Sequence, residues 1–207
     1  MPILNYGLYL LDHADFFGHN DLDMLEVGNG NLTAAETRSH FGLWAALKSP
    51  LLIGTPLDEI SESDLAVLEN WEILAFNQDP VYGAPAMPYK WGINPDWTFN
   101  RTHPAEFYSG QSVRGIHVFV LNTLDVKTKK EVVFKEVPGL NKKKEYEVRN
   151  MWTHKKVGVY KGKLQVVLEA HDTAALLFTE KKGGHPYAGK LPKSKLYEQK
   201  PKSWRSV

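Results

Sequence analysis

The stretch GHNDLDMLEVGNGNLT, residues 18–33, constrains the fold of this chain more than any other. It places two carboxylates, Asp21 and Asp23, on either side of Leu22, and then runs through apolar residues into a Gly-Asn-Gly loop. An extended segment with acids at one end, followed by such a loop and a helix, is typical of the active-site edge of an α/β domain. We therefore expect a short, mostly buried strand at residues 20–27.

The residues that follow predict a repeated strand-and-helix pattern. Thr33 and Glu36 have the spacing of a capping box, which predicts a helix over about residues 34–48. A continuous apolar run at 51–54, ended by glycine, predicts a strand buried on both faces. A second helix is expected to begin at Ser61. Strand, helix, strand, helix is the order of a parallel sheet.

After residue 80 the pattern changes to that of an all-β region. Residues 82–95, rich in Pro, Gly and aromatic side chains, predict a connection rather than an element. Regular short strands between polar turns predict an antiparallel β-sandwich. The expected strands are 115–121, 131–137, 145–152, 155–160, 164–168 and 173–179, with a hairpin joining the fourth and fifth through Lys161-Gly162-Lys163. Residues 181–207, which lose all periodicity, are expected to be a disordered basic tail.

Charge and composition exclude several classes of partner. The chain has 25 basic and 24 acidic residues, a formal net charge of +1, so no overall field favours nucleic acid or an anionic membrane. It has no cysteine, which excludes disulfides and thiolate metal sites. The apolar run within residues 1–11 lacks a basic start and a cleavage site, and it is too short to cross a bilayer. We expect no signal peptide in this chain, no nucleic-acid partner and no membrane partner.

Asp21 and Asp23 are the candidate functional pair. Two residues apart, both could face one side of an extended strand and there transfer protons or orient sugar hydroxyls. Alternatively, they could only cap the loop or pair with a cation. With His13, Asp15 and His19 they could resemble a metal site, but the spacing fits neither an EF-hand loop nor a zinc helix. We therefore expect no metal and no cofactor.

The histidine and tryptophans near these acids have simpler interpretations. His40, within the predicted helix, is expected to be a packed or surface residue rather than a catalyst. Trp44 and Trp71 stand at core spacing and are expected to pack against the sheet. Trp91 and Trp97 lie in an irregular segment, where an indole could stack on a sugar ring. We favour the alternative, that both fill the interface between the two regions.

Five segments together resemble a known family. Residues 20–29, N-D-L-D-M-L-E-V-G-N, resemble the seventh strand and loop of the glycoside hydrolase family 27 α-galactosidases, W-N-D-P-D-M-L-x-x-G-N, with His19 for its Trp and Leu22 for its Pro. The other four segments occur in the family's order and resemble the fungal members most. They are Glu36–Gly54, Leu74–Pro80, Tyr146–Trp152 and His171–Leu177.

The resemblance implies an α/β plus all-β fold. The family has a (β/α)8 TIM barrel followed by a C-terminal antiparallel β-sandwich. In this chain the last two β/α units of the barrel would occupy residues 1–80, the sandwich 81–180 and the tail 181–207. About six of the eight units are missing, so we expect an incomplete copy, a truncated product or gene-model fragment, with open strand edges.

The resemblance also implies an activity, which is the retaining hydrolysis of terminal α-galactosides by two Asp carboxylates about 5 Å apart. The family's K-x-D and R-x-x-x-D motifs, which hold them, would precede Gly18 and do not occur here, so no catalytic residue is expected in this chain. Only Asp23 and Met24 carry over as substrate-binding residues, Asp23 in the galactose pocket and Met24 as an apolar wall. Asp21 would support them.

The family's partner would be an α-galactoside, with no cofactor, and its full-length members would be secreted. The resemblance does not imply an oligomeric state. An alternative function from another class remains open: a non-catalytic carbohydrate-binding or interaction module built on the sandwich.

Overall fold

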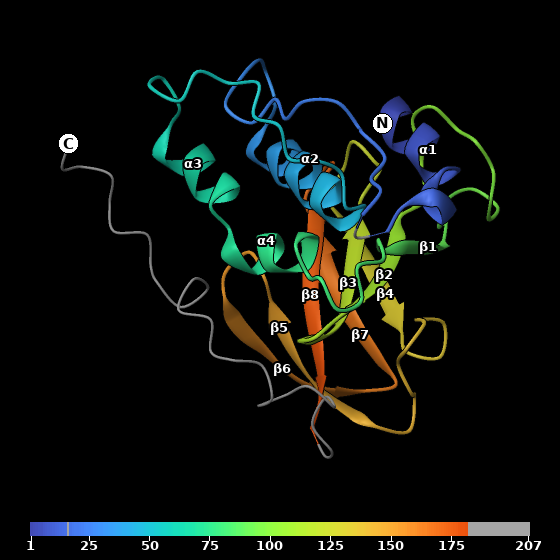
Figure 1. Ribbon diagram of the computed structural model, residues 1–207. Coiled ribbons are helices and arrows are strands. Elements are labelled where there is room, and N and C mark those ends of the chain that lie inside the picture. Colours follow the sequence, from blue (N-terminus) through green and yellow to red (C-terminus); the bar gives the residue numbers. More distant parts are fainter. Residues whose placement is uncertain (16, 182–207) are drawn as a thin grey trace.

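The computed structural model describes residues 1–15 and 17–181. Its helices lie together over one face and one end of a β-sandwich (Figure 1). The helical elements are α1 (Pro2–Leu8), the 3-10 helix η1 (Leu11–His13), α2 (Ala34–Ala46), α3 (Glu62–Leu68) and α4 (Trp71–Asn77). Within the described residues, no helix is both long enough and apolar enough to cross a membrane.

The strands form two antiparallel sheets, a larger one in the order β1-β2-β3-β8-β5-β6 and a smaller one made of β4 and β7. The strands are β1 (Met87–Lys90), β2 (Phe107–Ser112), β3 (Gly115–Leu121), β4 (Thr128–Val133), β5 (Glu145–Asn150), β6 (Lys155–Lys161), β7 (Lys163–Leu168) and β8 (Thr173–Glu180). The antiparallel β-sandwich predicted from the sequence is confirmed.

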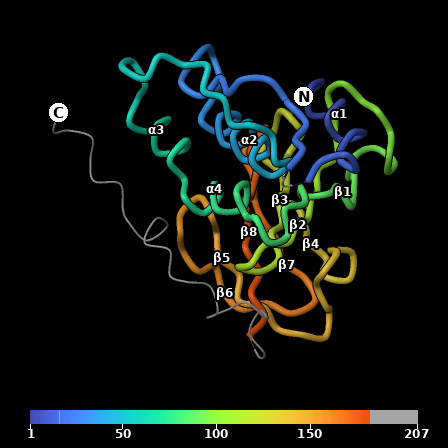
Figure 2. The backbone as a smooth tube through the Cα atoms, in the orientation of Figure 1, coloured from blue at the N-terminus to red at the C-terminus, as the bar shows by residue number. Residues whose placement is uncertain are grey.

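At β3 and β8 the larger sheet is buried on both faces, because the helices (Figure 2) cover one face and β4 and β7 pack against the other. On β3, Phe119 and Leu121 point into the core shared with the helices. Val118 and Val120, in alternation with them, point into the core shared with β4 and β7. One continuous apolar cluster therefore joins the helical region to the sandwich. The domain division at residue 80 stays a prediction.

The capping box is confirmed, but the two parallel strands are much shorter than predicted. Thr33 Oγ1 accepts the Glu36 amide, and the Glu36 carboxylate accepts the Thr33 amide. The segments 20–27 and 51–54 share a single parallel bridge, Leu25 to Ile53. The prediction that 51–54 is buried on both faces is wrong, since Leu52 is 51% and Ile53 45% exposed. The described chain supplies no third parallel strand to cover them.

The helix predicted from Ser61 divides into two at Asn70. The Asn70 side chain accepts the backbone amides of Glu72 and Ile73, and so begins α4. The prediction that Trp71 packs against the parallel sheet is therefore wrong. Trp71 is the first residue of α4, is 37% exposed, and stacks on His154 of the sandwich with ring centroids 5.6 Å apart.

Two predictions within the sandwich are also wrong. Residues 82–95 contain an element, β1, which pairs with β2 at the edge of the larger sheet. Residues 155–168 do not form a hairpin, because β6 pairs with β5 and β7 pairs with β4. The turn at Gly162, whose φ of 78° suits glycine, carries the chain from one sheet to the other. The predicted disordered tail lies outside the described residues from 182 onward.

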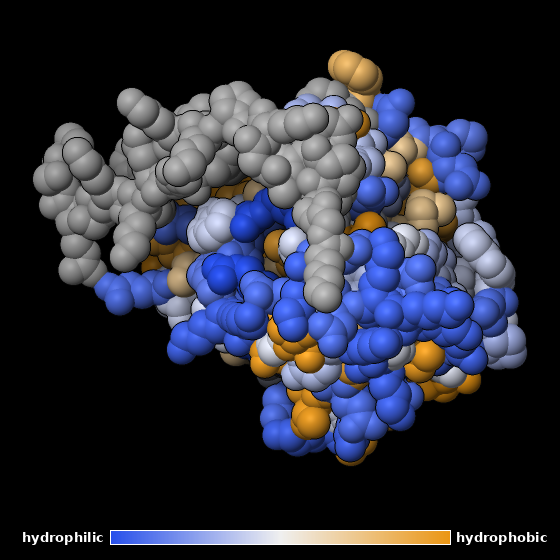
Figure 3. Space-filling model, turned by 90° about the horizontal axis from the view of Figure 1, so that it is seen from below, coloured by the Kyte–Doolittle hydropathy of each residue, from blue (hydrophilic) through white to orange (hydrophobic). Residues whose placement is uncertain are grey.

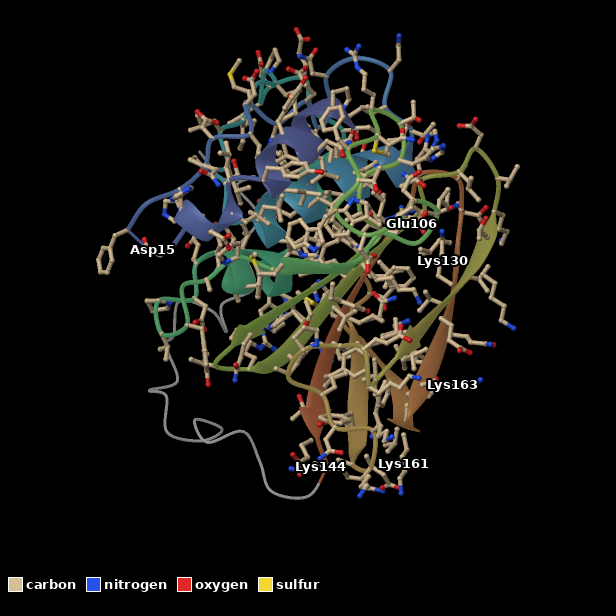
Figure 4. The ribbon with its side chains drawn as sticks, turned by 90° about the vertical axis from the view of Figure 1, so that its right-hand side faces the viewer. Asp15, Glu106, Lys130, Lys144, Lys161 and Lys163 are labelled. Carbon is tan, nitrogen blue, oxygen red and sulfur yellow. The ribbon has the colours of Figure 1, made fainter. Side chains whose placement is uncertain are left out.

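The near-zero net charge conceals a strong separation of charge along the chain. Residues 1–80 hold 13 acidic and 2 basic residues, whereas residues 81–207 hold 11 acidic and 23 basic residues. Strand register brings the β4–β5 loop, the turn at Gly162 and the end of β8 together at the sandwich end remote from the helices. Lys144, Lys161 and Lys163 project from this end (Figure 4), whose surface is largely hydrophilic (Figure 3).

Candidate functional site

The loop that holds Asp21 and Asp23 is a turn rather than a strand. Asp23 has a φ of 73°, a left-handed conformation that Asp tolerates better than most residues. Asp21 Oδ1 accepts the Asp23 amide at 2.8 Å, and Asp23 Oδ1 accepts the Met24 amide at 2.8 Å. The two acids are therefore not placed on one face of a strand, and the loop-capping interpretation holds for Asp21. Its side chain stabilises the turn that presents Asp23.

Two side chains, one in helix α2 and one just after it, hydrogen-bond to the backbone of this turn. The indole Nε1–H of Trp44 donates to the Asp23 carbonyl oxygen at 2.9 Å. The hydroxyl of Ser49, just beyond the helix, accepts the Leu22 amide at 3.0 Å. Trp44 is only 7% exposed, as its core spacing predicted. Two side chains anchored in the core thus hold the backbone on either side of the Asp23 carboxylate.

The parallel bridge fixes the other end of the turn. Leu25 donates its amide to the Leu52 carbonyl at 2.7 Å, and Gly54 donates its amide to the Leu25 carbonyl at 2.9 Å. A Cβ added at Gly54 would stand 3.1 Å from that same carbonyl oxygen, so a larger residue would crowd the bridge. Asp23 and Met24 therefore lie at the edge of a parallel strand pair.

His40 is a packed residue beside the site. Its Nε2 accepts the Glu26 amide at 2.9 Å, which places the proton of the neutral ring on Nδ1. The ring meets Trp44 edge to face, with centroids 4.3 Å apart. Burial lowers the pKa of His40 to about 4, so it is neutral at physiological pH. Its Nε2 lone pair is occupied by the Glu26 amide, so His40 supports the backbone of the loop.

The side chains available to a ligand are those of Asp23 and Met24. Asp23 is exposed, and its Oδ2 hydrogen-bonds to no residue in the described part of the chain. Met24 is 49% exposed. A carboxylate beside a thioether offers one strong acceptor and one apolar surface, which suits a sugar with hydroxyls and a C–H face.

The other candidates lie apart from this pair. Asp15 Oδ1 accepts the amides of Phe17 and Gly18, so Asp15 closes a turn. Among the described residues, no three His, Asp or Glu side chains gather as a metal site would require. Trp91 is 1% exposed and belongs to the cluster beneath the helices, as the interface interpretation predicted. Trp97 is 57% exposed, so for this residue that interpretation is wrong.

A second feature gave no signal in the sequence. A cavity of about 590 Å³ lies between α2, α3 and the strands β5 to β8. Three of its polar residues, Arg38, Asn150 and Asp172, are far apart in the chain, and Trp152 also lines the cavity. They come together only because the helices pack on the sandwich, so no local sequence motif predicts this cavity.

Comparison with known proteins identifies the chain's relatives. Residues 8–79 match the family described as alpha galactosidase A. Residues 102–178 match the family described as the alpha galactosidase C-terminal beta sandwich domain. The chain belongs to the family 27 α-galactosidases. The resemblance inferred from the sequence is confirmed, and so is the fold class, the last part of a TIM barrel followed by a β-sandwich.

Similar proteins occur in filamentous fungi. A protein of Aspergillus fumigatus named "Probable alpha-galactosidase B" is 51% identical over 185 residues, which cover 84% of this chain and 43% of the relative. A protein of the same name from Penicillium simplicissimum is 48% identical and covers 86% of this chain and 41% of the relative. The chain thus spans less than half the length of these relatives.

Solved structures agree with this relationship. α-Galactosidase I from Mortierella vinacea superposes with a TM-score of 0.74 at 30% identity, over 85% of this chain and 43% of the other. The Saccharomyces cerevisiae enzyme with raffinose gives a TM-score of 0.73 at 22% identity, over 86% of this chain and 51% of the other, and so supports the fold.

Proposed function

We propose that this chain carries the galactose-contacting corner of a retaining α-galactosidase. The observation that supports it most directly is the exposed Asp23 carboxylate, held in a left-handed turn at the edge of the Leu25–Ile53 bridge. In this role Asp23 accepts hydrogen bonds from sugar hydroxyls, and Met24 packs against the apolar face of the ring. Asp21 acts only through the backbone of the turn.

The whole protein of which this site is part would hydrolyse terminal α-galactosides. A retaining mechanism requires a nucleophile and an acid/base about 5 Å apart. The family's K-x-D and R-x-x-x-D motifs, which would hold this pair, do not occur in the chain. We therefore propose that the 207-residue chain binds galactose but does not by itself hydrolyse galactosides. Secretion, as proposed for the family's full-length members, belongs to the same hypothesis.

The test compares the chain with Asp23→Asn. Asn also tolerates the left-handed conformation and can accept the Met24 amide, so the turn is preserved while the charge is lost. We expect galactose to shift the backbone amide resonances of Met24 and Leu25 in the parent chain and not in the variant. Asp58→Asn, at another exposed acid, is the matched control and should behave as the parent chain.

Hydrolysis of a chromogenic α-galactoside completes the test. We expect no turnover above the uncatalysed rate from the parent chain. Turnover that disappears in Asp23→Asn would instead give Asp23 a catalytic role and contradict the proposal. Galactose shifts that persist unchanged in Asp23→Asn would place the sugar elsewhere.

A further inference from the structure

The cavity of about 590 Å³ lies where the helical region meets the open side of the sandwich. Helices α2 and α3 form one wall through Arg38, Ala66 and Val67. The turn after β5 and the strands β6, β7 and β8 form the others. Figures 1 and 2 show α3 above β5 and β6 at this side of the molecule. None of the lining residues belongs to the Asp23 turn, so this is a separate site.

The charged groups of the cavity compensate each other. Arg38 Nε donates to Asp172 Oδ1 at 3.0 Å, and its Nη2 donates to Oδ2 at 2.8 Å. This bidentate ion pair neutralises both charges and fixes the planes of the guanidinium and carboxylate groups relative to each other. Arg38 Nη1 hydrogen-bonds to none of the residues that the structure describes, and the side chain stays 30% exposed. The pair therefore offers hydrogen-bonding groups without a net charge.

An aromatic ring stands rigidly beside this pair. The Trp152 amide donates to Asn150 Oδ1 at 2.8 Å, and its indole Nε1–H donates to the Thr173 carbonyl at 2.7 Å. The ring edge packs against α2 so closely that a Cβ at Gly42 would stand 2.9 Å from Trp152 Cζ2. Asn150 Nδ2 has no acceptor in the described ranges. Trp152 is thus preorganised next to an unused amide donor.

The remaining lining is mostly apolar, with four further polar residues, Asn70, Thr153, Gln165 and Thr173. Val157 of β6 is 44% exposed and Val167 of β7 is 61% exposed, with Leu164 and Leu168 beneath them. The cavity volume is within the range of small-molecule sites, about 300–1,000 Å³. The combination of a fixed indole, apolar walls and neutral polar groups matches a ligand with C–H faces and several hydroxyls.

We propose that this cavity binds a neutral saccharide, independently of Asp23. An anion would gain little here, because Asp172 already compensates Arg38. A purely apolar ligand would leave Asn150 and Arg38 desolvated without partners, which costs free energy. A saccharide satisfies both groups with hydroxyls and packs its C–H face on the indole.

The test uses two valines on one strand. Val157 lines the cavity, whereas Val159, two residues further along β6 and 38% exposed, does not. Val157→Arg would fill the cavity mouth, and Val159→Arg is the matched control. The probe is raffinose, titrated into the isotopically labelled 207-residue chain and followed by NMR at the Trp152 indole and the Asn150 side-chain amide.

We expect raffinose to shift both resonances in the parent chain, in Val159→Arg and in Asp23→Asn. In Val157→Arg binding should weaken at least about tenfold, the equivalent of about 1.4 kcal/mol. No shift at Trp152 under saturating raffinose, or equal binding by the two arginine variants, would overturn the proposal. Shifts at Met24 without shifts at Trp152 would leave the Asp23 site intact and reject this one; the reverse result would reject the Asp23 site alone.

Discussion

The indole of Trp44 and the carbonyl oxygen of Asp23, 2.9 Å apart, couple the core of the helical region to the exposed acid of the site. Trp44 lies in α2 and is buried, while Asp23 is exposed and in a left-handed conformation. Non-glycine residues hold such conformations when the surroundings impose them. The hydrogen bond therefore explains how a short loop keeps its carboxylate in a fixed place.

Trp44→Phe tests this coupling. The variant keeps a ring in the core but loses the hydrogen bond and part of the buried area, so we expect a loss of about 1–3 kcal/mol in the free energy of unfolding. The galactose-induced shifts at Met24 should weaken as well. Denaturant unfolding measures the first effect and NMR titration the second. Trp71→Phe, at an exposed indole, should lower stability less and leave the shifts at Met24 unchanged.

Lys48 predicts a rise of stability with pH. The residue is 2% exposed, its Nζ donates to the Phe76 carbonyl oxygen, and it lies 4.7 Å from the centre of the Phe76 ring. Burial lowers the pKa of Lys48 to about 8 from an ordinary 10.5. Between these values the unfolded chain binds the proton and the folded chain does not, so stability should increase from pH 8 toward pH 10.

Lys48→Met removes the buried charge at similar length. We expect the variant to be at least as stable as the parent chain at pH 7 and to lose this pH dependence, which amounts to at most about 3 kcal/mol. Denaturant midpoints at pH 7.5, 8.5 and 9.5 give the comparison. Parallel curves for the two proteins would show that Lys48 does not titrate in this range.

His40 predicts a loss of stability in acid. Burial lowers its pKa to about 4 from an ordinary 6.5. As the pH falls through this interval, the unfolded chain takes up the proton first, so the free energy of unfolding decreases. His117, fully buried with a pKa lowered to about 3 by burial, adds to the same trend.

His40→Gln separates the two contributions. The Gln side-chain oxygen can accept the Glu26 amide as His40 Nε2 does, so the loop should be retained. We expect the loss between pH 6.5 and 4 to shrink by about 2 kcal/mol, with the part due to His117 remaining. Thermal unfolding across this range measures it. An unchanged acid dependence would be incompatible with a half-buried, neutral His40.

Glu106 and Lys130 form an ion pair inside the sandwich, and their side chains point toward one another in Figure 4. The atoms are 2.6 Å apart, and the side chains are 2% and 9% exposed. Lys130→Met would leave the carboxylate buried without its cation and should cost about 3–5 kcal/mol. Adding Glu106→Gln should recover most of that loss. Lys127→Met, in an exposed pair, should cost at most about 1 kcal/mol by the same denaturant assay.

The parts of the fold that local chemistry determines were predictable from the sequence. The Thr33–Glu36 capping box lies within four residues, and β3 was predicted with its observed bounds because its apolar run is continuous. The predictions that failed concerned which strands pair with each other. Nothing local to Lys161-Gly162-Lys163 distinguishes a hairpin from a crossing between sheets, because the choice depends on the partners β4 and β5.

The assignment of Asp23 and Met24 as substrate-binding residues stays a prediction. The sequence did not predict the left-handed turn that presents them, because Trp44, which hydrogen-bonds to this turn, lies 21 residues away. The cavity beside Trp152 was not predictable, since the Arg38–Asp172 pair joins residues 134 positions apart. Contacts of this kind follow from the docking of layers and leave no periodic pattern in the sequence.

The separation of charge predicts chromatographic behaviour that the net charge of +1 does not. Lys142, Lys143 and Lys161 are exposed at the remote sandwich end and have no ion pair among the residues described. Charges more than about 10 Å apart are screened from one another at 0.1 M salt, so this end should present a local positive charge whatever the charge of the helical region.

We expect the chain to bind a cation exchanger at pH 7 despite its acidic first 80 residues. Lys142→Glu with Lys161→Glu should weaken retention more than Lys129→Glu with Lys155→Glu, an equal change of charge away from that end. Equal elution of the two variants would mean that overall charge alone governs binding.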